Sequence, residues 1–147
     1  MQTLCVAYCR SHSLAGLAIR HHEPFGRWSH CALYTCDETV VEARFPTGVA
    51  ETQIGDFMRR YPRPGQRAVV AYRVHDAQAG IDWARRQIGK GYDWRAVAGL
   101  ALRSAWHQAD RWTCSELVEM ALARAGRPRW RDDASRITPN LSYMLLP

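Results

Sequence analysis

The stretch RWTCSELVEMALARAG, residues 111–126, carries the clearest helical pattern in this chain of 147 residues. Its apolar residues recur every three or four positions, which places them on one stripe: Leu117, Val118, Ala121, Leu122 and Ala125. That spacing predicts an amphipathic helix over Ser115–Ala125, and Gly126 is a typical residue to end it. The helix presents one apolar face to the rest of the fold, and a cysteine, Cys114, stands where it begins.

Strand patterns dominate the first half of the chain. Runs of β-branched, aromatic and apolar residues predict four strands: Thr3–Tyr8, Trp28–Thr35, Thr39–Phe45 and Arg67–Val74. Further helices are expected at three places: Ser13–Arg20, Ala77–Ile88 (capped by Asp76 and ended by Gly89) and Trp94–Arg103. Early strands followed by late helices predict an α+β fold, with an antiparallel sheet packed on one side by helices.

Three other segments carry weaker signals. GDFMRRYPRPG, residues 55–65, is expected to be irregular because prolines and a glycine close it. GKGYDW, residues 89–94, is expected to form a turn. The apolar C-terminal segment ITPNLSYMLLP, residues 137–147, is expected to dock on the body of the fold.

Length and composition favour one domain spanning residues 1–147. The chain has no run of about 18 apolar residues, so no transmembrane segment is expected. The N-terminus MQTLCVAYCR lacks the layout of a secretory signal, so the protein is expected to be cytoplasmic as synthesised, with export by another route left open. Five cysteines without regular spacing favour free thiols over a disulfide framework.

The net charge is +6, from 20 basic and 14 acidic residues. This balance favours an anionic surface or polymer as a partner, or simply a solvated surface. The chain has no nucleic-acid-binding motif, so nucleic acid is not an expected partner. Zinc binding is disfavoured, because the cysteine spacings are unlike those of paired knuckles and strand alternation would spread the thiols over two faces. The residues concerned are Cys5, Cys9, Cys31, Cys36 and His30; no metal and no cofactor is expected.

Cys114 is a candidate nucleophile. A cysteine in the first turn of a helix lies at the positive end of the helix dipole, which favours thiolate over thiol. The thiolate is the nucleophilic form, so the position suits covalent catalysis, although packing alone also explains a cysteine at a helix start. A catalytic thiolate needs a base, and that base needs a group to orient it.

His30 and Glu42 are the candidates for these two roles. His30 stands inside a predicted strand, whereas the other histidines fall in loops or near element ends. If residues 35–37 form the turn, Tyr34 pairs with Glu38 and His30 lies directly opposite Glu42. A carboxylate in the otherwise apolar strand VVEARF is costly without a partner, and the imidazole is the natural one. An exposed carboxylate at a sheet edge is the alternative interpretation.

Five segments match the motifs of a known family in their order along the chain: WSHCALYT, VVEARFPTGV, GKGYDW, WTCSELVEMALARAG and ITPNL. They resemble the permuted branch of the NlpC-type papain-like cysteine hydrolases, specifically the YiiX-like group, with lecithin retinol acyltransferase as a more distant relative. In that branch the histidine strand precedes the cysteine helix, as His30, Glu42 and Cys114 follow one another here. The chain departs from the pattern at Cys31, where an aliphatic residue is expected.

The resemblance implies a circularly permuted papain-like fold and a role for each candidate residue. Cys114 would be the nucleophile, His30 the base, and Glu42 the group that orients His30. Tyr92 is a candidate oxyanion donor or substrate contact, with a core tyrosine as the alternative. The protein would be a thiol hydrolase that cleaves an amide or ester through a thioester. A bacterial cell-wall peptide is the leading substrate by family analogy.

Two other functions stay open. A lipid-directed acyltransferase or phospholipase would fit the lecithin retinol relatives, a basic surface and six tryptophans. A non-catalytic binding module, or a phage-type structural component, would keep the same residues as a relic site. The expected partner is accordingly a peptide-like, peptidoglycan or acyl substrate.

Overall fold

The computed structural model describes residues 1–13, 16–17, 20, 23, 26–102, 106, 108–130 and 134–145. Five strands form an antiparallel sheet in the order β4-β3-β2-β1-β5: β1 (Gln2–Cys9), β2 (His30–Tyr34), β3 (Thr39–Arg44), β4 (Gly48–Gln53) and β5 (Arg67–Val74). The helices are α2 (Ile54–Arg60), α3 (Ala77–Arg85), α4 (Trp94–Ala101), α5 (Cys114–Arg124), α6 (Pro139–Met144) and the 3-10 turn η1 (Ala134–Arg136). Two short strands, β6 (Gly91–Tyr92) and β7 (Arg111–Trp112), pair in parallel. No helix within these ranges has the length and apolar content needed to cross a membrane.

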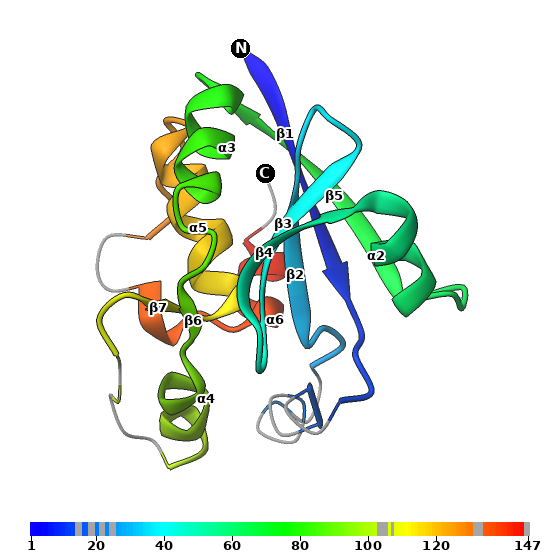
Figure 1. Ribbon diagram of the computed structural model, residues 1–147, viewed down its shortest axis with the longest axis vertical. Helices are drawn as coiled ribbons and strands as arrows, with labels where there is room; N and C mark the ends of the chain where they lie inside the picture. Colours follow the sequence, from blue (N-terminus) through cyan, green and yellow to red (C-terminus); the bar gives the residue numbers. More distant parts are fainter. Residues whose placement is uncertain are drawn as a thin grey trace.

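The main core lies between the sheet and α5, and Figure 1 shows α3 and α5 together on this side of the sheet. Leu117, Val118 and Leu122 of α5 are fully buried. They belong to one cluster with Val6 and Leu33 of the sheet. Burying apolar side chains of this kind stabilises a fold by about 1.5–3 kcal/mol each. The apolar stripe in the sequence therefore fixes which face of α5 meets the sheet.

A smaller core covers the opposite face of the sheet. Phe57 of α2 and Tyr61 just after it pack with Ala7, Ala32 and Val40. These strand residues alternate with those of the main core, so the two clusters lie on opposite faces, and Figure 1 shows α2 across the sheet from α5. The antiparallel sheet packed against helices is confirmed, but the expectation of helices on one side only is wrong.

The hairpin between β2 and β3 differs from its predicted register. Leu33 pairs with Val41 and Tyr34 with Val40, and the amide of Thr35 donates to the carbonyl of Thr39 at 2.9 Å. The loop is therefore residues 36–38 rather than 35–37, with Glu38 in the left-handed region (φ 55°) that such three-residue loops require. Pairing shifts by two positions, so His30 and Glu42 are diagonal neighbours and not direct partners. An even shift keeps both side chains on the predicted face.

Helix starts follow their capping residues. The Thr113 hydroxyl accepts from the amide of Glu116 at 3.2 Å, so α5 begins at Cys114, one residue before the predicted start. Asp76 caps α3 as predicted, accepting from the amide of Ala79 at 3.1 Å. Asp93 caps α4 in the same way. Each cap satisfies an amide that the helix itself leaves without a partner.

Several elements depart from the sequence prediction. The segment 55–65, expected to be irregular, contains most of α2, because Phe57 and Tyr61 recur at helical spacing and bury against the sheet. Strand β4 was not predicted, and the expected turn at 89–94 contains β6. Residues 14–15 and 18–19 of the helix predicted at Ser13–Arg20 lie outside the described residues, as do Arg103 and residues 146–147.

The C-terminal segment docks on the body of the fold, as predicted. Asn140 of α6 accepts from the backbone amide of Trp28 at 2.6 Å and donates to its carbonyl at 2.8 Å. Arg129 is buried with Glu119 of α5, and it also donates to the carbonyl of Ser142 at 3.1 Å. These contacts tie the end of the chain to α5 and to the segment that leads into β2.

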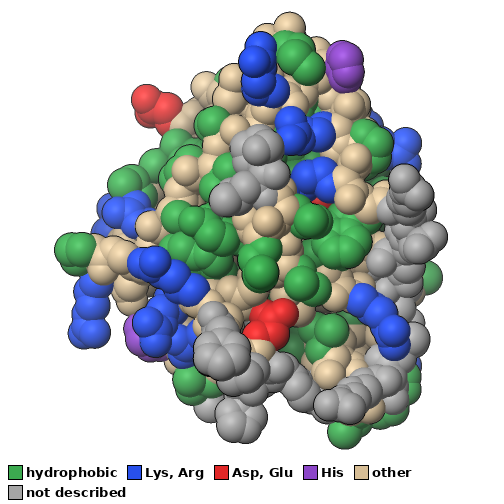
Figure 2. Space-filling view, turned by 180° about the vertical axis from the view of Figure 1, so that it is seen from behind, with side chains coloured by type: hydrophobic (Ala, Val, Ile, Leu, Met, Phe, Trp, Pro, Cys, Tyr) green, Lys and Arg blue, Asp and Glu red, His purple; other side chains and the backbone are tan. Residues whose placement is uncertain are grey.

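The positive charge is dispersed over the face that Figure 2 shows. On the face shown in Figure 2, Lys and Arg side chains lie scattered among apolar and polar ones and do not gather in one patch. Part of the basic charge is paired: Arg85 contacts Glu51 at 2.7 Å and Asp37 at 2.6 Å. Such exposed pairs contribute little to stability.

Gly80 of α3 is a point of close approach to α5. A Cβ atom there would lie 2.7 Å from the carbonyl oxygen of Ala121 and 3.0 Å from the Cβ of Ala125. Because a backbone atom cannot move aside alone, Gly80→Ala is expected to lower the free energy of unfolding by about 1–3 kcal/mol in urea denaturation. Gly55→Ala in α2 is the control, since the nearest atom is 3.7 Å away and alanine favours the helix. Equal stability of the two variants would contradict this packing.

Candidate active site

Cys114 lies at the N-terminus of α5, where its side chain is buried (2% exposed). The backbone amides of the first turn point toward this end of the helix, and the helix dipole makes it electropositive. Both effects favour a thiolate at this position. The apolar face of α5 holds the helix against the sheet, so the thiol is brought to the start of β2.

His30 is the first residue of β2 and meets Glu42 of β3. Its Nε2 lies 2.7 Å from Oε2 of Glu42, which leaves Nδ1 as the nitrogen available to the thiol. The imidazole also stacks on the ring of Tyr61, with centroids 6.3 Å apart and planes at 19°. A hydrogen bond and a stacked ring therefore hold the imidazole in one orientation.

Glu42 is a fully buried charge, a position that is costly unless the carboxylate is paired. Its second oxygen, Oε1, accepts hydrogen bonds from Nη2 of Arg60 and from the hydroxyl of Thr52, the latter at 3.2 Å. Burial alone would raise the pKa of Glu42, but the hydrogen bonds and positive charges of His30 and Arg60 lower it to about 2. The carboxylate therefore stays ionised beside His30 near neutral pH.

The pKa values of His30 and Cys114 move in opposite directions. Burial opposes a charge on His30, but hydrogen bonds with Cys114 and Glu42 and their negative charges raise its pKa to about 9. For Cys114, a hydrogen bond with the Cys31 side chain lowers the pKa, burial opposes this, and the hydrogen bond and charge of His30 lower it further, to well below its ordinary value. These opposite shifts favour a thiolate–imidazolium pair.

Cys31 supports the Cys114 thiolate from the strand. Burial, followed by its hydrogen bond with Cys114, raises the pKa of Cys31 well above the ordinary value, so it remains a thiol and can donate. A hydrogen bond with the Cys31 backbone also lowers the pKa of Cys114. An aliphatic residue would supply the backbone contact but no side-chain donor. The thiol at position 31 thus has a physical consequence for Cys114.

Tyr92 of β6 lies in the wall of the same site. Its ring is buried (6% exposed) and packs edge-on against Phe45, with centroids 6.0 Å apart. Burial and the negative charges of Cys114, Cys31 and Asp93 raise the pKa of Tyr92 well above its ordinary value. Its hydroxyl therefore keeps its proton and can act as a donor.

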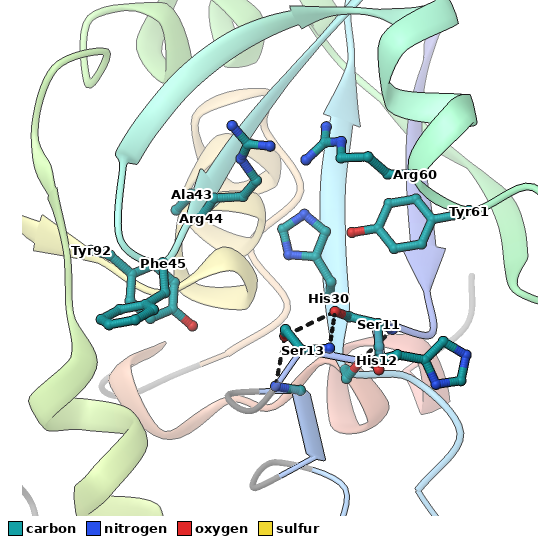
Figure 3. Close-up of a pocket in the computed structure, with 12 residues that line it drawn as sticks. Ser11, His12, Ser13, His30, Ala43, Arg44, Phe45, Arg60, Tyr61 and Tyr92 are labelled. Carbon is teal, nitrogen blue, oxygen red and sulfur yellow. Dashed lines mark hydrogen bonds between the residues drawn. The ribbon is translucent and has the colours of Figure 1, made fainter.

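A cavity of about 460 Å³ opens onto the imidazole. Figure 3 shows His30 at its centre, with Arg44 and Arg60 on one side of it and Ser11 and Ser13 on the other. The full lining is Ser11, His12, Ser13, Gly16, Ser29, His30, Ala43, Arg44, Phe45, Arg60, Tyr61 and Tyr92.

An apolar groove of about 400 Å³ adjoins the cavity. It shares Phe45 and Tyr92 with the cavity wall, and Trp94 and Val97 of α4 complete its lining. The site therefore has a polar compartment and an apolar compartment that meet at Phe45 and Tyr92.

The structure brings together four residues that the sequence singled out: His30, Glu42, Cys114 and Tyr92. Sequence reasoning missed Arg60, because the segment around it was expected to be irregular. Arg60 stands immediately before Tyr61 in a helical apolar pattern, and this pattern would have predicted a helix that carries Arg60.

Comparison with known proteins shows the fold. No protein-family model and no curated protein matches the chain. Among solved structures it is similar to the metalloprotein yiiX from Escherichia coli O157:H7, described as DUF1105. The two share 22% sequence identity with a TM-score of 0.58, over 86% of this chain and 68% of that chain. The mixed fold, an antiparallel sheet packed against helices, is therefore a YiiX-like arrangement.

A metal centre does not fit the described residues of this chain. Among them, no three His, Cys, Asp or Glu side chains are grouped to hold a metal ion. The oxygens of Glu42 are already engaged by His30, Arg60 and Thr52. The description of yiiX as a metalloprotein therefore finds no counterpart in the part of this chain that the structure describes.

The ionisation of Cys114 is measurable through alkylation by iodoacetamide. Because the thiolate is the reactive form and the pKa of Cys114 is well lowered, the rate at Cys114 is expected to rise much less between about pH 6 and 8 than that of a free thiol such as glutathione, whose rate increases about tenfold per pH unit. Mass spectrometry of the Cys114 peptide reads the rate. His30→Gln is expected to restore the pH dependence, and a wild-type rate that climbs in parallel with glutathione would contradict the ion pair.

Arg60 is expected to stabilise the fold through Glu42. Arg60→Gln removes a charged partner from a buried carboxylate, so the free energy of unfolding should fall by about 1–3 kcal/mol in urea denaturation. Arg59→Gln is the matched control: Arg59 is exposed and pairs only with exposed Asp56 among the described residues, so its loss should cost less than about 0.5 kcal/mol. Combining Arg60→Gln with Glu42→Gln should recover part of the loss. An equal loss of unfolding free energy in Arg59→Gln and Arg60→Gln would contradict the stabilising role of Arg60.

Proposed function

We propose that this protein is a cysteine hydrolase that cleaves an amide or ester bond through a thioester acyl-enzyme. The observation that carries the proposal is the meeting of the Cys114 thiol, at a helix N-terminus, with an imidazole that a buried carboxylate orients. Such a set of nucleophile, base and orienting group is what thiol catalysis needs. A cavity opens directly onto the imidazole and provides room for a substrate.

The proposed reaction starts from the thiolate–imidazolium pair. The Cys114 thiolate attacks the carbonyl carbon, and a C–S bond forms while the carbonyl oxygen becomes an oxyanion. When this intermediate collapses, the C–N or C–O bond breaks and the His30 imidazolium gives its proton to the leaving group. Water then gives a proton to His30 and adds to the thioester carbon. Release of the acid restores the Cys114 thiolate.

We propose two groups as donors to the oxyanion. The backbone amide of Cys114, in the first turn of α5, points out of the helix end and has no partner within the helix. The protonated hydroxyl of Tyr92 lies in the electrostatic field of the same thiol. We propose Tyr92 as the second donor or as a substrate contact. Glu42 keeps Nδ1 of His30 directed toward the thiol throughout.

The order of these residues supports the permuted NlpC-type interpretation. The histidine strand and the carboxylate strand come before the cysteine helix, and the overall fold is similar to yiiX. We propose that residues 1–147 act as one such hydrolase domain. A bacterial cell-wall peptide is the leading substrate on that analogy. The chemistry itself depends on the thiol, the imidazole and the carboxylate.

A lipid-directed acyltransferase or phospholipase is the second candidate, and one observation favours it. The apolar groove beside the cavity exposes about half of Trp94 (51%) and of Phe45 (58%) to solvent. Exposed aromatic rings of this size beside a reactive site suit an acyl chain. Co-sedimentation with anionic vesicles separates the lipid-directed function from the peptide hydrolase: a protein that does not bind the vesicles argues for the peptide substrate.

The test of the proposed function is a substrate panel of peptidoglycan fragments, acyl esters and phospholipids. Cys114→Ala and His30→Gln are each expected to lower the rate on the accepted substrate at least about 10³-fold, and Glu42→Gln about 10²-fold. Activity is also expected to fall above about pH 9, where His30 loses the proton it must donate. Full activity of Cys114→Ala on a substrate that wild type cleaves would falsify the assignment.

A further inference from the structure

Arg44, the last residue of β3, holds a guanidinium in the cavity that makes only a long ion pair with a carboxylate. Its side chain is 37% exposed and lines the cavity beside His30. The carboxylate nearest to it is Glu42, whose Oε1 lies 4.0 Å from Nε, beyond hydrogen-bond reach. Arg60 differs, since its Nη2 donates to that same oxygen. Within the described part of the chain, the Arg44 guanidinium makes no hydrogen bond.

The cavity therefore carries one surplus positive charge. Arg44 and Arg60 contribute two positive charges, and Glu42 offsets one of them. Cys114 and His30 sum to zero whether they are thiolate and imidazolium or thiol and imidazole. No Asp or Glu is among the described residues that line the cavity. One surplus positive charge in a polar pocket matches a ligand with a single negative charge.

We propose that Arg44 binds a carboxylate of the substrate next to the bond that Cys114 attacks. The inference rests on the proposed function, because it takes the cavity around His30 as the substrate site. A guanidinium presents its N–H donors in a planar fork that fits the two oxygens of a carboxylate. Figure 3 shows Arg44 and Arg60 on the same side of His30, away from Ser11 and Ser13. The substrate class is an acylated amino acid or a peptide with a free carboxylate near the scissile bond.

The neighbouring compartment sets the orientation of such a substrate. The apolar groove begins at Phe45, the residue directly after Arg44, and runs to Trp94 and Val97. A carboxylate is excluded from this groove, because its desolvation there would have no compensating hydrogen bond. The charged group is thus directed to Arg44 and an apolar substituent to the groove, with the reacting carbonyl between them.

Alkylation by iodoacetate and iodoacetamide tests the carboxylate site. The two reagents have the same size and differ in one negative charge. At pH 7 and low salt, the ratio of the iodoacetate rate to the iodoacetamide rate at Cys114 should exceed the ratio at exposed Cys36 by about tenfold. Arg44→Gln should lower the Cys114 ratio to that of Cys36. Arg59→Gln removes the same charge outside the cavity and should leave the ratio as in wild type.

Each outcome of this experiment decides a separate point. An unchanged ratio in Arg44→Gln overturns the carboxylate site. That result includes a fall of both rates by one common factor, because Arg44 would then act on the thiol through Glu42. If neither iodoacetate nor iodoacetamide alkylates Cys114 of the folded wild type, the proposed function fails, and the inference fails with it. Circular dichroism and thermal denaturation establish that each variant is folded.

Discussion

A buried carboxylate on β3 of the sheet is the constraint on which the rest of the site depends. Glu42 is fully excluded from solvent, and an unpaired charge in that position would cost several kcal/mol. Its partners come from three other segments: His30 of β2, Thr52 of β4 and Arg60 of α2. Pairing this one charge therefore fixes α2 against the sheet and aligns three neighbouring strands. The same pairing orients the imidazole that faces the thiol.

The position of the thiol has a separate physical origin. The apolar face of α5 packs on the sheet, and Thr113 caps the helix so that it begins at Cys114. On the other side, α6 and the Arg129–Glu119 pair hold α5 in place. Stability and reactivity thus come from different contacts. Apolar burial sets where the helix lies, whereas His30, Cys31 and the helix terminus set the charge on the sulfur.

The site also shows why local charge balance governs what it can bind. Glu42 offsets one of the two guanidinium charges, with its hydrogen bond going to Arg60, and the thiol and the imidazole sum to zero, so one positive charge is left in surplus among the described residues around the cavity. The total charge of the protein does not reveal this, because many other basic side chains lie dispersed on the surface, as on the face in Figure 2. A net charge describes long-range attraction, and specificity follows from which charges face the cavity.

Some features of this fold were predictable from local patterns. The helix of α5, the strand β5 and the cap at Asp76 were predictable because spacing and capping act over a few residues. The contact between His30 and Glu42 was predicted from a wrong register, and it formed because a shift of two positions keeps a side chain on its face. Helix α2 was missed, and with it Arg60, because the prolines at 62 and 64 suggested a loop. Burial of Phe57 and Tyr61 outweighed that local signal.

The sequence by itself determined strands β1, β2, β3 and β5 with their two faces, helices α3, α4 and α5, and the candidate thiol, imidazole and carboxylate, since these follow from periodicity and residue chemistry. Only the tertiary structure decided which charges are paired. Arg60 lies 18 positions after Glu42, and Cys31 lies 83 positions before Cys114. No local pattern links residues so far apart. Their contacts exist because two cores on opposite faces of one sheet bring α2 and α5 to the same strand ends.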